Sequence, residues 1–210
     1  MDWLLENSLS EEKGIICGID EAGRGPLAGP VFAAAVILPK GIEIPGLDDS
    51  KRLNTVKREQ LYEEIRRIAV DYAIAHAEPY EIDKMNIVNA TMLAMKRAVE
   101  QLRVKPDYLL VDGNIVRDLP KPAMAIVKGD GKIPSIAAAS ILAKVARDRF
   151  MYELDTLYPR YKFAKHKGYP TKEHREIVKE FGICPAHRRS YMRKIIGEVV
   201  DETVQERFWD

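Results

Sequence analysis

The chain has 210 residues, 46% of them hydrophobic, and its formal net charge is +1 at pH 7. This length can bury one substantial core with a small appendage, and the charge excludes a globally basic nucleic-acid binder. Cys17 and Cys184 lie far apart in the sequence, which indicates a reduced intracellular protein. The sequence has neither a signal-type N-terminus nor an apolar run of membrane-spanning length. We therefore expect a soluble, cytoplasmic protein with no membrane partner.

The first predicted strand, over 14–20, leads into two adjacent acids. Asp20 and Glu21 end an apolar run and precede Gly23-Arg24-Gly25. Neighbouring side chains on a strand point to opposite faces, so both acids can serve one site only if the strand stops there and the backbone turns. Glycines permit such a turn and let backbone N–H groups approach a ligand. The segment predicts a metal and phosphate site, with a charged hairpin corner as the alternative.

The next elements alternate between strands and helices. A second strand is predicted over 31–38, joined to the first through a Gly/Pro-rich connection as in a hairpin. Apolar residues at helical spacing predict an amphipathic helix over 55–70. A strand over 72–77 and a helix over 87–102 follow. This order indicates an α/β sheet with a parallel part, in which ligand sites lie beyond the carboxyl ends of the strands.

Two later strands are also predicted to end in an acid. One, over 106–113, carries Asp112, and the other, over 123–130, carries Asp130. With Asp20, these acids would occupy the ligand-binding edge of the sheet. Clustered carboxylates hold hard divalent cations, and two such ions can promote in-line phosphodiester hydrolysis. General acid-base catalysis would need only two acids, and no Cys/His set has the spacing of a zinc site.

A long helix is predicted to begin at Pro134, and its small residues would let it pack closely against the sheet. Ser140 and Lys144 lie one turn apart on this helix and therefore share a face. A hydroxyl and an ammonium on one face can hold a phosphate. The alternative is a buried serine beside a surface lysine.

Basic residues outnumber acids between 160 and 194, as binding to a phosphate backbone requires. The alternative is an ordinary solvated helix face. A helix is predicted to open at Pro170-Thr171 and to close at Phe181-Gly182. We expect residues 1–170 to form a catalytic domain and 171–210 a small C-terminal helical cap and tail within the same compact unit.

Four segments together resemble the bacterial ribonuclease HII family, and the resemblance covers nearly the whole chain. It implies a ribonuclease-H-like mixed five-stranded sheet flanked by helices. It also implies an endonuclease that cuts the RNA strand of RNA/DNA hybrids and cuts 5′ of single ribonucleotides in duplex DNA. The ends would be 3′-hydroxyl and 5′-phosphate, as ribonucleotide removal from DNA needs. The segments are 18–26, Val111-Asp112-Gly113, Lys128-Gly129-Asp130 with 137–145, and Lys167-Gly168-Tyr169.

The resemblance also implies roles for single residues. Asp20, Glu21, Asp112 and Asp130 would be catalytic and hold two Mg²⁺ or Mn²⁺ ions. Gly23, Arg24 and Gly25 would read the ribose 2′-hydroxyl, by which a protein tells RNA from DNA, and Tyr169 would pack on the following deoxyribose. Phosphates would be contacted by Ser50, Lys51, Ser140 and Lys144. A Cβ added at Gly23 or Gly25 is expected to harm ribose discrimination more than stability.

Some family-like residues are left outside the predicted catalytic set. Asp148 lies in Arg147-Asp148-Arg149, which is typical of a charge network on a helix, and His187-Arg188-Arg189 is given no catalytic role. Phe208-Trp209 resembles an incomplete clamp-binding peptide, although packing onto the fold is the favoured interpretation. A clamp-type protein partner is therefore conceivable but unsupported, and a monomer is expected by analogy with the family.

Other readings stay open beside this one. A different ribonuclease-H-like metal nuclease, such as a resolvase or exonuclease, would also cluster acids, but Gly23-Arg24-Gly25 and Tyr169 disfavour it. The related type HIII enzymes usually carry an extra N-terminal domain, for which a first acid at position 20 leaves no room. A non-catalytic nucleic-acid binding module is disfavoured by the intact set of acids.

Overall fold

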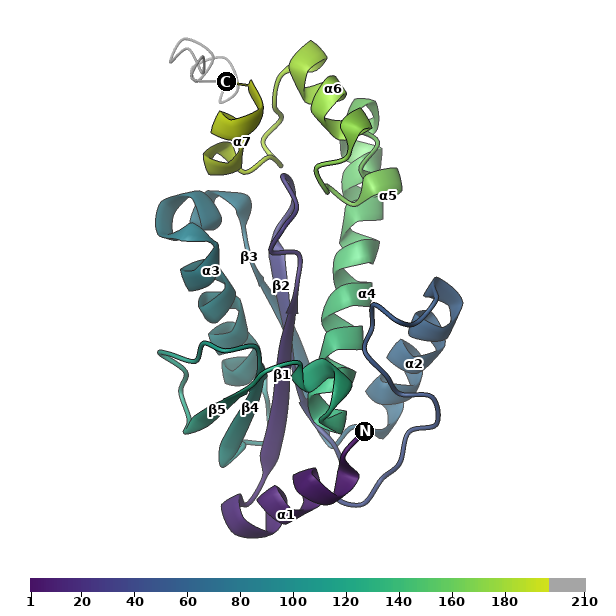
Figure 1. Ribbon diagram of the computed structural model, residues 1–210, viewed down its shortest axis with the longest axis vertical. Helices are drawn as coiled ribbons and strands as arrows, with labels where there is room; N and C mark the ends of the chain where they lie inside the picture. The colour runs from purple at the N-terminus through teal and green to yellow at the C-terminus, as the bar shows by residue number, and fades with distance from the viewer. Residues whose placement is uncertain (197–210) are drawn as a thin grey trace.

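A mixed five-stranded sheet forms the centre of the protein, with the strand order β3-β2-β1-β4-β5 (Figure 1). The structure, a computed structural model, describes residues 1–196. Strand β1 (Ile16–Ala22) pairs antiparallel with β2 (Val31–Ile37), and β2 pairs antiparallel with β3 (Asp71–Ala77). On its other edge β1 runs parallel to β4 (Tyr108–Asp112), which runs parallel to β5 (Ala123–Ile126). The predicted hairpin and the predicted mixed sheet are confirmed.

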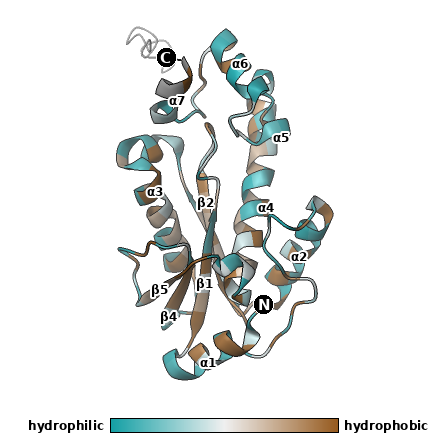
Figure 2. Ribbon diagram, in the orientation of Figure 1, coloured by the Kyte–Doolittle hydropathy of each residue, from teal (hydrophilic) through white to brown (hydrophobic). Residues whose placement is uncertain are grey.

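Helices cover both faces of this sheet. Helix α3 (Pro79–Gln101) lies on one face, while α2 (Thr55–Ile68) and α4 (Pro134–Leu157) lie on the other (Figure 1). Each face has its own apolar cluster between strands and helices. Hydrophobic residues accordingly gather on the central strands, whereas α6 is largely hydrophilic (Figure 2). The expected α/β layering follows from this double burial.

Helix α4 approaches the sheet very closely, as its small residues predict. Ala137, Ala138 and Ala139 are completely buried. A Cβ built on Gly18 of β1 would lie 2.2 Å from the backbone carbon of Ser135, so only glycine allows this approach. The close contact places the middle of α4 beside the acidic end of β1.

An N-terminal helix, α1 (Trp3–Lys13), was not predicted from the sequence. None of its residues is buried. Asp2 caps the helix by accepting a hydrogen bond from the Leu5 N–H at 2.8 Å. Helix α1 crosses one end of the sheet (Figure 1). Glu6 accepts a hydrogen bond of 3.0 Å from the Ser135 N–H, which ties α1 to the start of α4.

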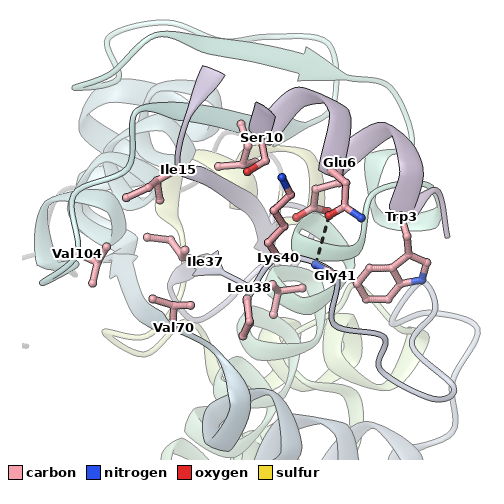
Figure 3. A pocket seen from close by; sticks show the side chains of 13 residues that line it. Trp3, Glu6, Ser10, Ile15, Ile37, Leu38, Lys40, Gly41, Val70 and Val104 are labelled. Atoms are coloured by element: carbon pink, nitrogen blue, oxygen red, sulfur yellow. Dashed lines mark hydrogen bonds between the residues drawn. The ribbon is translucent and has the colours of Figure 1, made fainter. Parts of the chain in front are cut away.

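A small hollow lies beneath α1. Its volume is about 190 Å³, and Figure 3 shows Trp3 and Lys40 among the side chains that line it. The Gly41 N–H donates to Asn7 Oδ1 across its rim at 3.3 Å. None of the predicted catalytic or substrate-binding residues lines this hollow.

Helix α3 is interrupted at Asn86, whose backbone is non-helical (φ 69°, ψ 165°). The helix predicted over 87–102 corresponds to the part that follows this break. The preceding turns begin with a capping box, in which Glu78 and Glu81 bond each other's backbone N–H groups. The break lies close to α7 (Arg189–Ile196), because Asp83 of α3 accepts hydrogen bonds from the Arg189 and Ser190 N–H groups.

The C-terminal part stands on the far end of α4 (Figure 1). It contains the short α5 (Phe163–His166), α6 (Lys172–Phe181) and α7, and Met151 of α4 shares an apolar cluster with Ile177 of α6. Thr171 caps α6 and Gly182 follows its end, which confirms the predicted bounds of that helix. The boundary at 171 stays a prediction, and Phe208-Trp209 lies outside the described residues. Within residues 1–196 no helix is long and apolar enough to cross a membrane.

Candidate metal and nucleic-acid site

Three of the predicted acids meet on the α4 side of the sheet. One carboxylate oxygen from each of Asp20, Asp112 and Asp130 lies within 4.8 Å of the other two. Asp20 comes from β1, Asp112 ends β4, and Asp130 lies in the 3-10 turn Gly129–Gly131. The parallel register, which pairs Ile19 with Val111, brings Asp20 beside Asp112.

The local structure that brings the acids together differs from the expectation at two of them. β1 continues through Glu21 to Ala22, so Asp20 lies inside the strand rather than at its end. β5 ends at Ile126, and Asp130 is reached through a turn. That turn is fixed by Asp112, whose Oδ1 accepts hydrogen bonds from the Gly129 N–H at 2.7 Å and the Asp130 N–H at 3.4 Å.

Glu21 lies apart from the three clustered carboxylates. Because the strand does not turn at this position, the alternation of side chains directs Glu21 to the opposite face from Asp20. There Glu21 Oε1 lies 3.2 Å from Arg24 Nη1, and both residues line a narrow cleft together with Asp112. The expected turn at 20–21 is therefore wrong, and the role of Glu21 as a metal ligand stays a prediction.

The cluster is electrostatically strained. Burial and the neighbouring charges of Glu21 and Asp112 hold the pKa of Asp20 far above its usual range. Burial and the charge of Asp130 also raise the pKa of Asp112. Burial raises the pKa of Glu21, while Arg24 opposes the rise. Like charges that are forced together out of water favour a bound cation or proton.

A basic residue and two hydroxyls surround the cluster. Lys51 Nζ lies 2.9 Å from Asp130 Oδ2, and Ser50 Oγ lies 2.8 Å from Ser140 Oγ. Burial opposes the charge of Lys51, but its bond to Asp130 raises the pKa of the ammonium above the usual value. A hydrogen bond from Ser140 also acts on Asp20. The predicted phosphate residues Ser50, Lys51 and Ser140 thus lie together beside the acids.

Lys144 is held away from Ser140, although both lie on one face of α4. Its Nζ lies 2.6 Å from Asp148 Oδ1. Burial lowers the pKa of Lys144, and Asp148 opposes the decrease. Asp148, which is not part of the predicted site, therefore fixes the position of Lys144, a residue predicted to contact a phosphate.

The Gly23-Arg24-Gly25 loop lies against Tyr169. A Cβ built on Gly25 would meet the Tyr169 ring at 3.8 Å, an ordinary contact. Gly23 differs, because its φ is +98° and a Cβ there would lie 2.1 Å from Arg147 Nε. The packing of Arg147 thus requires glycine at position 23, so a substitution there is expected to cost stability as well as discrimination. The prediction that substitution harms discrimination more than stability stays a prediction for both glycines.

Sequence reasoning missed two arginines beside this loop. Arg147 and Arg188 are completely buried. Arg147 was expected in a surface charge network, and Arg188 was given no role. Nothing in the sequence marks either as buried, because arginine is one of the residues least often found inside proteins.

The residues present fit a divalent metal. Three carboxylates of like charge lie close together, and one of them, Asp112, also lines a cleft. They form a set of oxygen donors that suits Mg²⁺ or Mn²⁺. A zinc-type set is a poorer description, because no cysteine or histidine among residues 1–196 joins this cluster.

Comparison with known proteins adds independent information. The family model of ribonuclease HII matches residues 17–194. A ribonuclease HII of Caldicellulosiruptor saccharolyticus is 55% identical over 193 residues, which cover 92% of this chain and 94% of that protein. The crystal structure of the Pyrococcus horikoshii ribonuclease H2 superposes with a TM-score of 0.71 at 32% identity, over 86% of this chain and 96% of the other. The RNase HII in the PCNA:RNase HII complex from Archaeoglobus fulgidus gives 0.69 at 30% identity, over 84% and 95%.

Proposed function

Since the chain belongs to the ribonuclease HII family and is a ribonuclease H endoribonuclease, we propose that it cuts 5′ of single ribonucleotides in duplex DNA as well as the RNA strand of hybrids. Hydrolysis would leave a 3′-hydroxyl on the upstream strand and a 5′-phosphate on the ribonucleotide. The single observation that carries this proposal is the convergence of Asp20, Asp112 and Asp130 within 4.8 Å.

The three aspartates would hold divalent ions, Mg²⁺ or Mn²⁺, and Glu21 would reach them only through the cleft that it lines together with Asp112. Bound ions of this kind can lower the pKa of a water and stabilise the charge that develops on the leaving oxygen. The protein's own part is positioning. The bond from the Gly129 N–H orients Asp112, and the Glu21 N–H, which donates to Asp20 Oδ1 at 2.7 Å, orients the buried Asp20 carboxylate.

Recognition of the ribose would fall to the Gly23-Arg24-Gly25 loop and Tyr169. Arg24 and Gly25 are exposed, and Tyr169 is 41% exposed at the same place. A sugar between loop and ring would meet backbone donors on one side and an aromatic face on the other. A 2′-hydroxyl is the group that distinguishes the two sugars at one position.

Phosphates would bind at Lys51, Ser50, Ser140 and Lys144, with further basic residues along the C-terminal part. That part is less basic in effect than its composition predicts, because Lys162 and Lys165 both pair with Glu173. Contacts to phosphates set register and give salt-dependent affinity. A clamp-type partner stays a hypothesis that rests on the PCNA complex of the Archaeoglobus fulgidus protein.

The test is cleavage of a labelled DNA duplex that carries one ribonucleotide. We expect cutting with Mg²⁺ or Mn²⁺, none with EDTA, and a product that ends one nucleotide before the ribonucleotide with a 3′-hydroxyl. An all-DNA duplex of the same sequence serves as the control. Binding without any cutting in either metal would favour the non-catalytic module instead, and cutting of the all-DNA duplex would favour another nuclease of this fold.

A further inference from the structure

Two buried arginines face the ribose-reading loop without a carboxylate partner. Arg147 and Arg188 are completely buried, and within the described part of the chain their guanidinium groups donate hydrogen bonds to backbone carbonyls. A buried charge is costly unless other groups solvate it. Burial lowers the pKa of Arg188 to about 10, and it also lowers that of Arg147. Other groups in the structure must therefore offset the cost of burying these two charges.

Arg188 binds backbone carbonyls of the loop. Its Nη2 donates to the Gly23 carbonyl at 2.6 Å, and its Nη1 donates to the Arg24 carbonyl at 2.9 Å. Its Nε and Nη2 both reach the Gly29 carbonyl, at 2.9 and 2.8 Å. Tyr191 adds a hydroxyl donor to the Arg24 carbonyl at 3.0 Å. The carbonyls of Gly23, Arg24 and Gly29 in this loop therefore all point inward, toward one guanidinium group.

The direction of these carbonyls fixes the direction of the neighbouring N–H groups. A trans peptide is planar, with its C=O and N–H pointing opposite ways, and the described chain has no cis peptide bond. Because the carbonyls of Gly23 and Arg24 point inward, the N–H groups of Arg24 and Gly25 point outward. In the described residues neither N–H donates to another backbone group. Both residues are exposed, beside Tyr169.

Arg147 also binds this loop and joins it to the segment that carries Tyr169. Its Nε donates to the Pro30 carbonyl and its Nη2 to the Ala28 carbonyl, each at 3.3 Å. Nη2 also donates to the Lys167 carbonyl at 3.0 Å, and the guanidinium lies 5.7 Å from the centroid of the Tyr169 ring.

We propose that Arg188, supported by Arg147, is a positioning residue for ribose recognition. It turns the loop carbonyls inward so that the Arg24 and Gly25 N–H groups are presented as donors to the 2′-oxygen of the ribonucleotide. The inference rests on the proposed function, because it assigns the way in which that site tells ribose from deoxyribose. The unpaired charge behind the loop also strengthens these outward donors, since carbonyls bound to a cation are polarised.

The test compares Arg188→Gln and Arg188→Lys with the wild type. The measured quantities are kcat and KM for the single-ribonucleotide duplex, the inhibition constant of an all-DNA duplex, and the rise in melting temperature on adding Mn²⁺. We expect Arg188→Gln to lower kcat/KM at least tenfold, with the other two quantities unchanged. Arg188→Lys should rescue only part of the loss, because one ammonium cannot reach three carbonyls in the same geometry. Arg103→Gln is the control and should match the wild type, because Arg103 is an exposed residue just after α3 that pairs with Asp71 at the start of β3.

Tyr191→Phe keeps the test decisive if Arg188→Gln does not fold. It removes one donor to the Arg24 carbonyl without burying or removing a charge, and we expect a several-fold fall in kcat/KM. Wild-type kcat/KM in both Tyr191→Phe and Arg188→Lys would overturn the inference while leaving the proposed function intact. A wild-type protein that does not cut the substrate would instead remove the proposed function itself. Weaker inhibition by the all-DNA duplex, together with a smaller rise in melting temperature on adding Mn²⁺, would show that Arg188→Gln disturbs the structure as a whole. That result would also overturn the inference.

Discussion

Lys51 Nζ lies 2.9 Å from Asp130 Oδ2, so a cation of the protein itself already touches the acidic cluster. Lys51 precedes α2 in sequence, and its side chain is 73% exposed. An exposed ammonium can leave one carboxylate for another anion at little cost. We infer that Lys51 pairs with Asp130 in the absence of substrate and turns to a phosphate when the duplex binds.

Replacing Lys51 should therefore change two affinities in opposite directions. In Lys51→Ala the affinity for Mn²⁺ should rise, by about threefold to tenfold, because a competing cation is gone. The affinity for duplex should fall, because a phosphate contact is lost. Calorimetric titration with Mn²⁺ and binding of labelled duplex in EDTA measure the two effects. A loss of Mn²⁺ affinity would contradict this account.

Asp20→Asn should stabilise the metal-free protein while abolishing its activity. At pH 8 the ionised Asp20 is disfavoured in the fold, because burial and its neighbours raise its pKa. A carboxyl whose pKa is raised on folding lowers stability progressively as the pH rises above its unfolded pKa. The amide removes this repulsion, and we expect a gain of about 1 kcal/mol in the free energy of unfolding in EDTA.

Chemical denaturation at pH 8 with EDTA measures that gain. The exposed Glu180→Gln is the matched control, since it removes one carboxylate charge far from the cluster and should leave stability within about 0.5 kcal/mol. An equal gain in both variants would show that net charge, rather than the acidic cluster, is responsible.

Two glycines only two positions apart should respond differently to the same substitution. Gly23→Ala should lower the melting temperature by several degrees, because φ is +98° and the new Cβ would collide with Arg147. Gly25→Ala should leave the melting temperature close to that of the wild type, since its Cβ meets only the Tyr169 ring at 3.8 Å. Its kcat/KM on single-ribonucleotide duplex should still fall. Unimpaired cutting by Gly25→Ala would mean that the loop does not read the sugar.

The C-terminal part carries a chain of neutral histidines. His187 Nε2 lies 3.1 Å from His174 Nε2, and His174 Nδ1 lies 2.9 Å from the Tyr169 carbonyl. Because a carbonyl only accepts, the network assigns the proton of His174 to Nδ1 and leaves its Nε2 to accept from His187. The His187 ring in turn accepts from the Cys184 N–H at 3.0 Å. Each ring is therefore bound in its neutral form.

These hydrogen-bonded neutral histidines should make the stability of the protein sensitive to acid. Burial lowers the pKa of His187 to about 3 and that of His174 to about 4. Since both values are depressed below 6.5, the unfolded state binds more protons between pH 6.5 and 4, and stability falls as the pH decreases through that window. The loss should be on the order of 3 kcal/mol.

Chemical denaturation at pH 7 and at pH 5 checks this prediction. The quantity compared is the free energy of unfolding that the wild type and a double histidine variant each lose between the two pH values. His174→Gln with His187→Gln should lose less stability on acidification than the wild type. The comparison cancels the acids whose raised pKa values act in the opposite direction. Identical pH dependence in both proteins would show that the histidines do not set the acid limit.

The sequence indicated the centre of the site because its chemistry lies in residue type and position. Asp20 lies near the end of an apolar strand, Asp112 ends one and Asp130 follows one, and parallel pairing brings such acids together whatever the details of the turns. The course of the backbone around these acids could not be predicted from the sequence. Whether β1 turns at Glu21 depends on its pairing with β2, which extends to Ala22 and Phe32, and pairing between distant residues leaves no local signal.

The features that the sequence could not provide are those made by burial. Arg147 and Arg188 look like ordinary surface cations, and only the fold shows that they bind loop carbonyls. Helix α1 lacks a buried stripe and so gave no periodic signal. Gly23 was assigned to ligand approach, whereas the packing of Arg147 is what its missing Cβ allows.

The central claim is that the three aspartates bind the divalent ions that catalysis requires. The most direct measurement is a Mn²⁺ titration run beside cleavage of the single-ribonucleotide duplex, for the wild type and for Asp20→Asn, Asp112→Asn and Asp130→Asn. We predict that the wild type binds Mn²⁺ and cuts, and that each variant loses Mn²⁺ affinity and at least about a thousandfold in cleavage rate, or about 4 kcal/mol. Wild-type cleavage and Mn²⁺ binding by any one of the three variants would contradict the account.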